Sequence, residues 1–305
     1  MRFSPMKSAN VSPAMPSLNP KTIAEAIDAC RERLRAVSHT PWLDARLLAQ
    51  YVTGLDASAV IAYGDASLDE RRQARLFDLA ERRAAGEPVA YIVGRKSFCG
   101  LDIAVDRRAL VPRPETEELV LACVQDWSGH SPAIADIGTG CGAIACALAH
   151  MLPDACIIAS DASDSALELA AHNIEALAFG EQITLVQGDL FEGFPDGVRF
   201  DAVVANLPYV ATDNLDELEP NVRDHEPSFA LFGGPDGLDV YRRLIAQLPE
   251  RLAPGAALYL ECGPRNARLL GSLITAAFPS GSTEIRNDAA GLERMVICRM
   301  EGTAQ

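Results

Sequence analysis

The chain has 305 residues, 49% of them hydrophobic and 23% charged, which is typical of a folded protein with room for one large and one smaller domain. Its net charge of −15 argues against the cationic surface that duplex nucleic acids require, so direct nucleic-acid binding is not expected. The sequence contains no apolar stretch of the roughly 18 residues that a membrane-spanning helix needs.

The eight cysteines form no C-x-x-C pair and have no histidine at metal-ligand spacing. This pattern is typical of reduced thiols in a cytoplasmic protein, and it predicts no metal site. Residues 1–19 are rich in Ser, Pro, Asn and Met and lack the continuous apolar core of a secretory signal. We expect a disordered tail at 1–19, a cytoplasmic location, no membrane attachment and a monomer, with organelle targeting by the tail as the weaker alternative.

Residues 20–86 are expected to form a small helical domain. Thr22 and Glu25 have the spacing of a capping box at the start of a first helix. Another helix is expected from about residue 69 to residue 85, where a glycine follows. Between them, residues 43–52 predict a helix with one apolar face. The residues of that face are Leu43, Leu47, Leu48 and Tyr51.

The next segment, residues 87–112, is expected to be a hairpin linker. The apolar runs Val89–Val93 and Leu101–Val105 are separated by a glycine-bearing stretch, so we expect them to pair as two strands. A Pro-Arg-Pro sequence follows the linker. Residues 115–125 then predict a helix with acidic residues in its first turn.

From residue 134 onward, apolar runs of strand length alternate with helical patterns such as 163–177 and 238–252. This order predicts an α/β fold with a doubly wound, seven-stranded, mostly parallel sheet. Its last two strands are expected to form an antiparallel pair at the edge. The predicted strands are 134–137, 156–160, 183–186, 200–205, 256–261, 283–285 and 295–299.

A glycine-rich loop follows the first of these parallel strands. Gly138, Gly140 and Gly142 allow a tight turn and a close approach of a ligand to the main chain. The helical pattern at 143–150 begins directly after them, so its free N–H groups favour a phosphate or a carboxylate. The loop also satisfies the dinucleotide pattern G-x-G-x-x-A, which leaves NAD open.

Three acidic residues accompany the loop. Asp161 ends the next strand, where a carboxylate holds the ribose of either NAD or S-adenosylmethionine. Asp136, just before the glycines, is close enough to face a positively charged ligand group. Asp189 is placed to accept from an adenine amino group beside Leu190. Turn or cap roles remain open for Asp136 and Asp189.

Asn206-Leu207-Pro208-Tyr209 follows the buried run 200–205, at the carboxyl end of a strand, where open α/β sheets bind their ligands. The tetrapeptide offers the side-chain carbonyl of Asn206, the main-chain carbonyl of Leu207 and the aromatic face of Tyr209. Two acceptors beside a flat face suit a planar –NH2 group. Together with the glycine loop, they indicate methylation of an amide or exocyclic amine nitrogen.

These motifs resemble those of the class I S-adenosylmethionine-dependent methyltransferases. More narrowly, the chain resembles the family that methylates the side-chain amide of glutamine in bacterial peptide chain release factors. The stretch from Pro112 to Glu117, Pro-Arg-Pro-Glu-Thr-Glu, is the most family-specific match. The other matches are residues 86–92, 111–117, 136–142, 206–209 and 233–238.

The resemblance implies a methyltransferase domain at 113–305, a substrate-recognition role for 20–86, S-adenosylmethionine as cofactor without a metal, and release factors as protein substrate. Asn206, Leu207, Pro208 and Tyr209 would be catalytic and bind the amide of the glutamine in the Gly-Gly-Gln loop. The implied cofactor-binding residues are Asp136, Gly138, Thr139, Gly140, Cys141, Gly142, Asp161, Asp189, Leu190 and Asn206. Phe98, Arg113 and Glu115 would support the substrate pocket.

One position departs from the family pattern, because Leu207 stands where the motif Asn-Pro-Pro-Tyr has its first proline. Leucine keeps the main-chain carbonyl, and Pro208 still biases it towards an extended conformation. Asn-Leu-Pro-Tyr also occurs in RNA enzymes that methylate adenine. Another protein glutamine, a nucleic-acid adenine and a small-molecule amine therefore stay open as substrates. An NAD-dependent oxidoreductase and a non-catalytic binding module are more remote alternatives.

Overall fold

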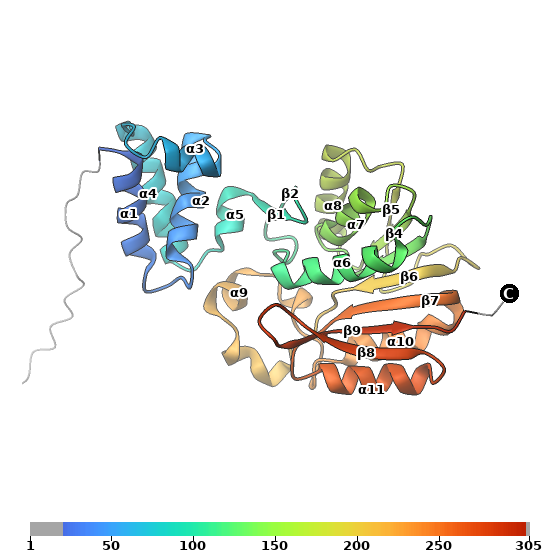
Figure 1. Cartoon of the computed structure of the whole chain (residues 1–305). Helices are drawn as coiled ribbons and strands as arrows, with labels where there is room; N and C mark the ends of the chain where they lie inside the picture. Colours follow the sequence, from blue (N-terminus) through green and yellow to red (C-terminus); the bar gives the residue numbers. More distant parts are fainter. Residues whose placement is uncertain (1–20, 303–305) are drawn as a thin grey trace, which may run out of the picture. The chain divides into compact units, whose positions relative to one another are not determined.

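The computed structural model describes residues 21–302, apart from the side chains of residues 215–217. The chain divides between Ala85 and Gly86 into two compact units (Figure 1). The tail predicted at residues 1–19 lies outside the described residues. Within the described part, no helix combines the length and the apolar character needed to cross a membrane.

The first unit is a group of four helices, and the three that the sequence predicts are confirmed. The predicted capping box is also present, because Thr22 Oγ1 accepts from the Glu25 N–H and the Glu25 carboxylate accepts from the Thr22 N–H. The sequence analysis missed one short helix, which Asp56 caps. The four helices are α1 (Ile23–Leu34), α2 (Pro41–Thr53), α3 (Ala57–Ala62) and α4 (Glu70–Ala84).

The predicted apolar face of α2 is wrong in part. Leu48 is buried as expected, but Leu43 and Tyr51 are 47% and 42% exposed. The buried face is rotated because Asp44 points inward, where its carboxylate pairs with Arg83 of α4 at 2.7 Å. Both side chains of this pair are buried, and a hydrophobic pattern cannot anticipate a buried charge that has found a partner.

The second unit contains the predicted seven-stranded sheet. Its strands lie in the order β5-β4-β3-β6-β7-β9-β8, and the five strands from β3 to β7 are parallel. The last two strands are antiparallel, as expected, but β9 lies inside the sheet and β8 forms the edge. The bounds are β3 (Ala133–Ile137), β4 (Cys156–Asp161), β5 (Ile183–Gln187), β6 (Phe200–Ala205), β7 (Leu252–Glu261), β8 (Ser282–Asn287) and β9 (Glu293–Arg299).

Helices cover both faces of the sheet (Figure 1). One apolar core lies under α6 (Pro114–Trp127), α7 (Ala143–Met151) and α8 (Asp164–Ala176). The other lies under α10 (Asp239–Arg251) and α11 (Ala267–Ala277). Alternate residues of the central strand β3 feed the two cores, which makes the fold doubly wound as predicted. Between β6 and α10 the chain forms η1 (Thr212–Glu217), α9 (Pro220–His225) and η2 (Ser228–Ala230).

The predicted hairpin exists, but one of its strands was placed wrongly. Val89–Val93 forms the short helix α5 instead of a strand. Its β-branched residues suggested a strand, but Pro88 at its start and Gly94 at its end, with φ of +75°, favour a single helical turn. The hairpin pairs β1 (Arg95–Phe98) with β2 (Leu101–Ala104).

Candidate active site

A pocket lies at the carboxyl ends of the parallel strands, as expected for an open α/β sheet. It brings together most of the site residues that the sequence predicts. Those lining it are Phe98, Gly138, Thr139, Gly140, Cys141, Asp161, Asp189, Leu190, Asn206, Leu207 and Pro208. The predicted residues Arg113, Glu115, Asp136, Gly142 and Tyr209 are not among the residues that line it.

The glycine loop is held against the ends of β4 and β6. The N–H groups of Gly138 and Thr139 donate to the Ser160 carbonyl at 2.9 and 2.8 Å. Gly138 has a φ of +75°, and a Cβ there would come within 2.8 Å of the Leu207 side chain. The left-handed backbone and the close Leu207 side chain therefore both favour glycine at this position.

Asp136 supports the loop from behind. Its carboxylate is fully buried and accepts from Thr139 Oγ1 at 2.6 Å and from the Ala145 N–H, in the first turn of α7, at 3.1 Å. Burial raises the pKa of Asp136 to about 7, and these two hydrogen bonds oppose the rise. Its other oxygen is buried and has no partner within the described residues. A contact of Asp136 with a charged ligand group stays a prediction.

Asp161 faces the pocket at the end of β4. One carboxylate oxygen accepts from the Gly140 N–H and the other from the Ser163 N–H, both at 2.9 Å. Burial raises the pKa of Asp161, while these main-chain donors lower it. Each oxygen keeps a lone pair for a further donor, so the carboxylate is suited to two hydroxyl groups.

Asp189 has a partner that the sequence did not reveal. Its carboxylate forms an ion pair with Arg243 of α10, and both side chains line the pocket. The next residue, Leu190, is buried with a φ of +59°, and its carbonyl accepts from Ser160 Oγ at 2.9 Å. Arg243 follows Asp189 by more than fifty residues in a helix without a motif, so only the fold could identify it.

Asn206 is connected to a buried acid through a hydroxyl. Its Nδ2 donates to Thr116 Oγ1 at 3.2 Å, and that hydroxyl donates to Glu261 Oε2 at 2.6 Å. Thr116 and Glu261 are 3% and 1% exposed. Burial raises the pKa of Glu261 to about 7, and the bond from Thr116 opposes the rise. Thr116 lies in the Pro-Arg-Pro-Glu-Thr-Glu motif, after Arg113 and Glu115, which were predicted to have roles, but no role was predicted for Thr116 itself.

Leu207 is held by its main chain. Its N–H donates to the hydroxyl of Tyr241 at 3.1 Å, and that hydroxyl donates in turn to the Glu261 carbonyl. Tyr241 is fully buried in α10. Sequence reasoning missed Tyr241 because its helical spacing suggests only a core position.

Tyr209 is packed away from the pocket lining. A Cβ at Gly263 would lie 3.3 Å from its ring, so Tyr209 packs over this glycine. Its carbonyl accepts from Asn266 Nδ2 at 3.0 Å. Burial raises the pKa of its hydroxyl, and the charge of Glu261 adds to the rise. Tyr209 therefore remains neutral at physiological pH.

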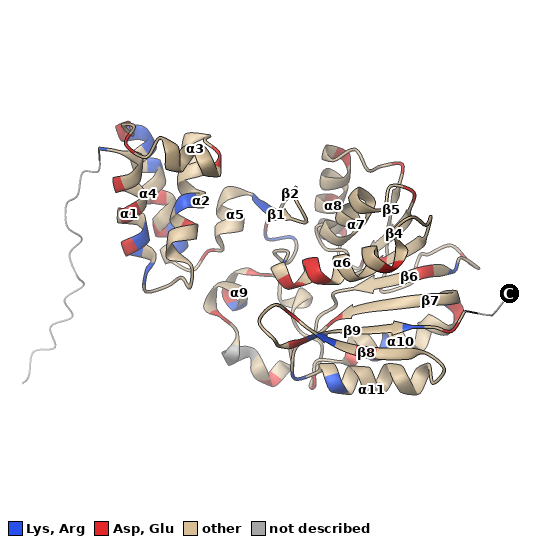
Figure 2. Cartoon of the chain, viewed as in Figure 1, with Lys and Arg blue, Asp and Glu red and all other residues tan. Residues whose placement is uncertain are grey.

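The three residues assigned to pocket support have different positions. Phe98 is fully buried and lines the pocket. Arg113 pairs at 2.6 Å with Glu226, whose buried carboxylate also accepts from the Val111 N–H. Glu115 lies in the first turn of α6, which is acidic as predicted (Figure 2).

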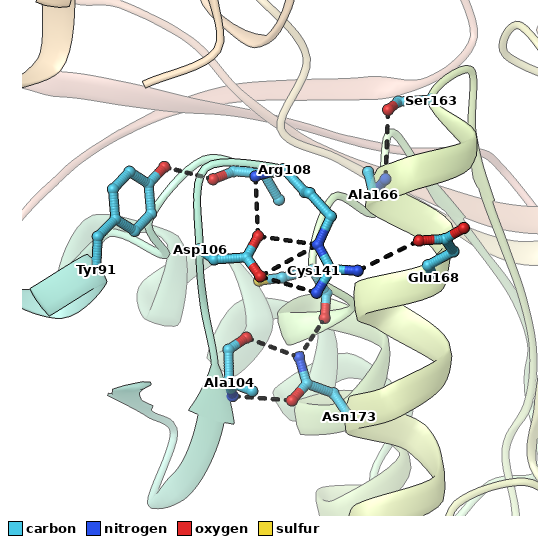
Figure 3. A network of polar contacts seen from close by, with 10 residues as sticks. Tyr91, Ala104, Asp106, Arg108, Cys141, Ser163, Ala166, Glu168 and Asn173 are labelled. Atoms are coloured by element: carbon cyan, nitrogen blue, oxygen red, sulfur yellow. Dashed lines mark hydrogen bonds and ion pairs between the residues drawn. The ribbon is translucent and has the colours of Figure 1, made fainter. Parts of the chain in front are cut away.

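The segment predicted to be a linker lies in the second unit and forms a wall of the pocket. Asn173 of α8 fixes it by bonding both the N–H and the carbonyl of Ala104, and it also donates to the Cys141 carbonyl in the glycine loop (Figure 3). Arg108 bridges Asp106 to Glu168 of α8 in the same view. The wall residues that line the pocket include Arg108, Ala109, Leu110 and Pro112.

Comparison with known proteins identifies the family. Residues 25–94 match the model of the PrmC N-terminal domain, and residues 115–219 match that of the methyltransferase small domain. The release factor glutamine methyltransferase of Bradyrhizobium diazoefficiens is 40% identical over 261 residues, which cover 84% of this chain and 87% of the relative. The chain belongs to the release factor glutamine methyltransferase family.

The corresponding protein of Rhodopirellula baltica is 38% identical over 266 residues, covering 85% of this chain and 89% of the relative. A solved methyltransferase from Pyrococcus furiosus covers 77% of this chain and all of its own, with a TM-score of 0.51 and 20% identity, and so shares the fold. The predictions of the family, the fold and an S-adenosylmethionine-dependent methyltransferase are thus confirmed. Within the described residues, no cluster of His, Cys, Asp and Glu is arranged to hold a metal ion.

Proposed function

We propose that the protein transfers a methyl group from S-adenosylmethionine to the side-chain amide nitrogen, N5, of the glutamine in the Gly-Gly-Gln loop of peptide chain release factors. The named activity of relatives at about 40% identity supports this substrate. The observation that carries the proposal is the position of Asn206 and Leu207, which lie at the pocket edge beside the glycine loop.

The pocket fits the methyl donor. The glycine loop lines the pocket and suits the methionine part, and Asp161 suits the two ribose hydroxyls. Leu190 provides an apolar surface for adenine, next to the carboxylate of Asp189. When bound, S-adenosylmethionine supplies a methyl group on a sulfonium, and the methyl–sulfur bond breaks as the methyl–nitrogen bond forms.

The chain's contribution to the reaction is orientation. An amide nitrogen is a weak nucleophile because its lone pair is delocalised into the carbonyl. Asn206 Oδ1 and the Leu207 carbonyl each accept one N–H of the substrate amide, which directs the lone pair towards the donor and favours pyramidalisation. Positioning and preorganised electrostatics then lower the barrier. The methylated nitrogen loses its extra proton afterwards without a dedicated base.

Two further features complete the proposal. Pro208 keeps Leu207 extended, and the packing of Tyr209 over Gly263 anchors the end of the tetrapeptide. Residues 20–86 serve to recognise the protein substrate. We further propose that the protein acts as a monomer in the cytoplasm, where release factors act.

The test is intact-mass analysis of a purified release factor after incubation with the protein and S-adenosylmethionine. A single added methyl is expected, and it should be absent when the glutamine of the Gly-Gly-Gln loop is changed. Asn206→Ala should abolish turnover and leave donor affinity in calorimetric titration nearly intact. No added methyl, with donor binding demonstrated, would redirect the assignment to another amide or amine, which Leu207 makes a real alternative.

A further inference from the structure

We propose that Glu261, at the end of β7, is the positioning residue for both substrate acceptors. Its carboxylate, acting through Thr116, fixes which way round the Asn206 amide stands. Its main-chain carbonyl, acting through Tyr241, fixes the Leu207 peptide. The inference rests on the proposed function, because the two groups that it positions are the proposed acceptors.

The first connection has a defined hydrogen-bond polarity. A carboxylate only accepts, so the Thr116 hydroxyl must give its single proton to Glu261, across 2.6 Å. The Thr116 oxygen is then available only as an acceptor, and the group of Asn206 that faces it must be the –NH2. The amide oxygen is left for the pocket. A wrongly turned amide would present a donor to the substrate –NH2, where an acceptor is needed.

The second connection depends on the residue that distinguishes this chain from the family motif. Leu207 has an N–H, which a proline at this position would lack, and this N–H donates to Tyr241. The Tyr241 hydroxyl in turn donates a hydrogen bond to the carbonyl of Glu261. Both bonds are buried, so breaking either one leaves an unpaired polar group in the core. The peptide that carries the second acceptor is thereby locked to the same residue.

The charge state of Glu261 sets the direction of the first connection. Besides Thr116, the groups that act on its carboxyl are Arg294 of β9, Arg113 and Glu115 at the start of α6, and Tyr209. Burial outweighs the two arginines and raises the pKa of Glu261 to about 7. Once protonated, the carboxyl can donate to Thr116, whose proton can then turn towards Asn206 and favour the flipped amide. Turnover is therefore expected to fall as the pH drops through this pKa.

Four variants test this role. Thr116→Val keeps the shape of the side chain but removes the hydroxyl, and we expect kcat to fall about 10- to 100-fold with an unchanged Kd for S-adenosylmethionine. Thr116→Ser keeps the hydroxyl and should recover most of kcat. Glu261→Gln removes the titration, so the acidic limb of the kcat profile should disappear. Thr275→Val is the matched control, because its hydroxyl bonds Gly271 within α11.

Thermal unfolding of each variant separates a folding defect from a positioning effect, since Thr116→Ser and Thr116→Val should melt within a few degrees of each other. The proposal is overturned if Thr116→Val keeps both the wild-type kcat and the acidic limb, or if Thr116→Ser is as impaired as Thr116→Val. Asn206→Ala separates the acceptor role of Asn206 from its connection to Glu261. If Asn206→Ala is active, Asn206 is not a substrate acceptor, and the proposed function is disproved at this point. If Asn206→Ala is inactive but Thr116→Val is fully active, only the connection to Glu261 is disproved.

Discussion

At the scale of single residues, position 207 shows how a departure from a motif is accommodated. The family motif has proline there, whereas Leu207 has an additional N–H. Leu207 is only 4% exposed, so this N–H is buried. An unpaired buried donor costs about 1–3 kcal/mol. The hydroxyl of Tyr241 accepts this donor, so the substitution is matched by a partner in α10.

A double-mutant cycle measures this match. Tyr241→Phe leaves both the Leu207 N–H and the Glu261 carbonyl without a partner and should lower the free energy of unfolding by about 2–4 kcal/mol. In a Leu207→Pro background the N–H is already absent, so the same change should cost about 1 kcal/mol less. Urea unfolding of the four proteins gives the coupling energy.

Tyr259→Phe serves as the control for this cycle. Its hydroxyl bonds Asp126 at 2.7 Å and shares no partner with residue 207. The effects of Tyr259→Phe and Leu207→Pro should therefore add to within about 0.5 kcal/mol. Additivity of Tyr241→Phe with Leu207→Pro as well would contradict the proposed match.

The residue scale also shows where sequence reasoning stopped. The glycine loop, Asp161 and the tetrapeptide from Asn206 could be identified because each is a short local pattern. Thr116, Tyr241 and Glu261 could not, because they come from α6, α10 and β7 and acquire a role only where those elements meet. In the sequence they have the spacing of ordinary core residues.

At the scale of elements, the β1–β2 hairpin is joined to the glycine loop by one side chain. Asn173 of α8 makes three hydrogen bonds, two to Ala104 and one to Cys141. These bonds connect the wall of the pocket to its floor (Figure 3). The rigidity of the pocket therefore depends on a helix that does not itself carry the motif.

Asn173→Ala should loosen this wall. We expect the loss of three bonds to buried or part-buried main-chain groups to lower the free energy of unfolding by about 2–4 kcal/mol and to weaken S-adenosylmethionine binding several-fold. His172→Ala, at the exposed neighbouring position, should leave stability within about 0.5 kcal/mol. Donor affinity equal to wild type in calorimetric titration of Asn173→Ala would contradict the coupling.

The elements themselves were predicted unevenly, for physical reasons. The five parallel strands were found because buried parallel strands are mostly continuous apolar runs. The antiparallel pair was found because two short strand patterns flank a glycine-bearing turn. The helix α5 was mistaken for a strand because the caps at its two ends outweigh the strand propensity of five residues. The face of α2 was wrong because Asp44 buries its charge against Arg83. A local sequence pattern reports the propensity of a segment, but it does not show the distant partner, such as Arg83, that can override this propensity.

At the scale of the whole molecule, the second unit alone contains the large apolar cores and the pocket. Both large apolar cores consist of residues from the second unit, and so does every residue that lines the pocket. The first unit has its own buried apolar residues, such as Leu48 and Leu79. The pocket can therefore be studied in the absence of the first unit.

Removal of residues 1–85 tests the role proposed for the first unit. The remaining chain should unfold cooperatively and bind S-adenosylmethionine with near wild-type affinity, because its cores and its pocket are intact. Methylation of a release factor should fall at least about 10-fold, through KM, if the first unit recognises the substrate. Circular dichroism provides the folding control. Undiminished kcat/KM in a folded truncation would remove the recognition role.

The order of synthesis gives the position of β9 a further consequence. β9 is made last, yet it lies between β7 and β8, and β8 has no other partner in the sheet. β8 can therefore pack against α11 but has no strand to pair with until the ribosome adds β9. The N–H of Cys262, next to Glu261, also bonds the Arg294 carbonyl of β9. A nascent chain can thus contain every residue that lines the donor pocket before the neighbourhood of Glu261 is complete.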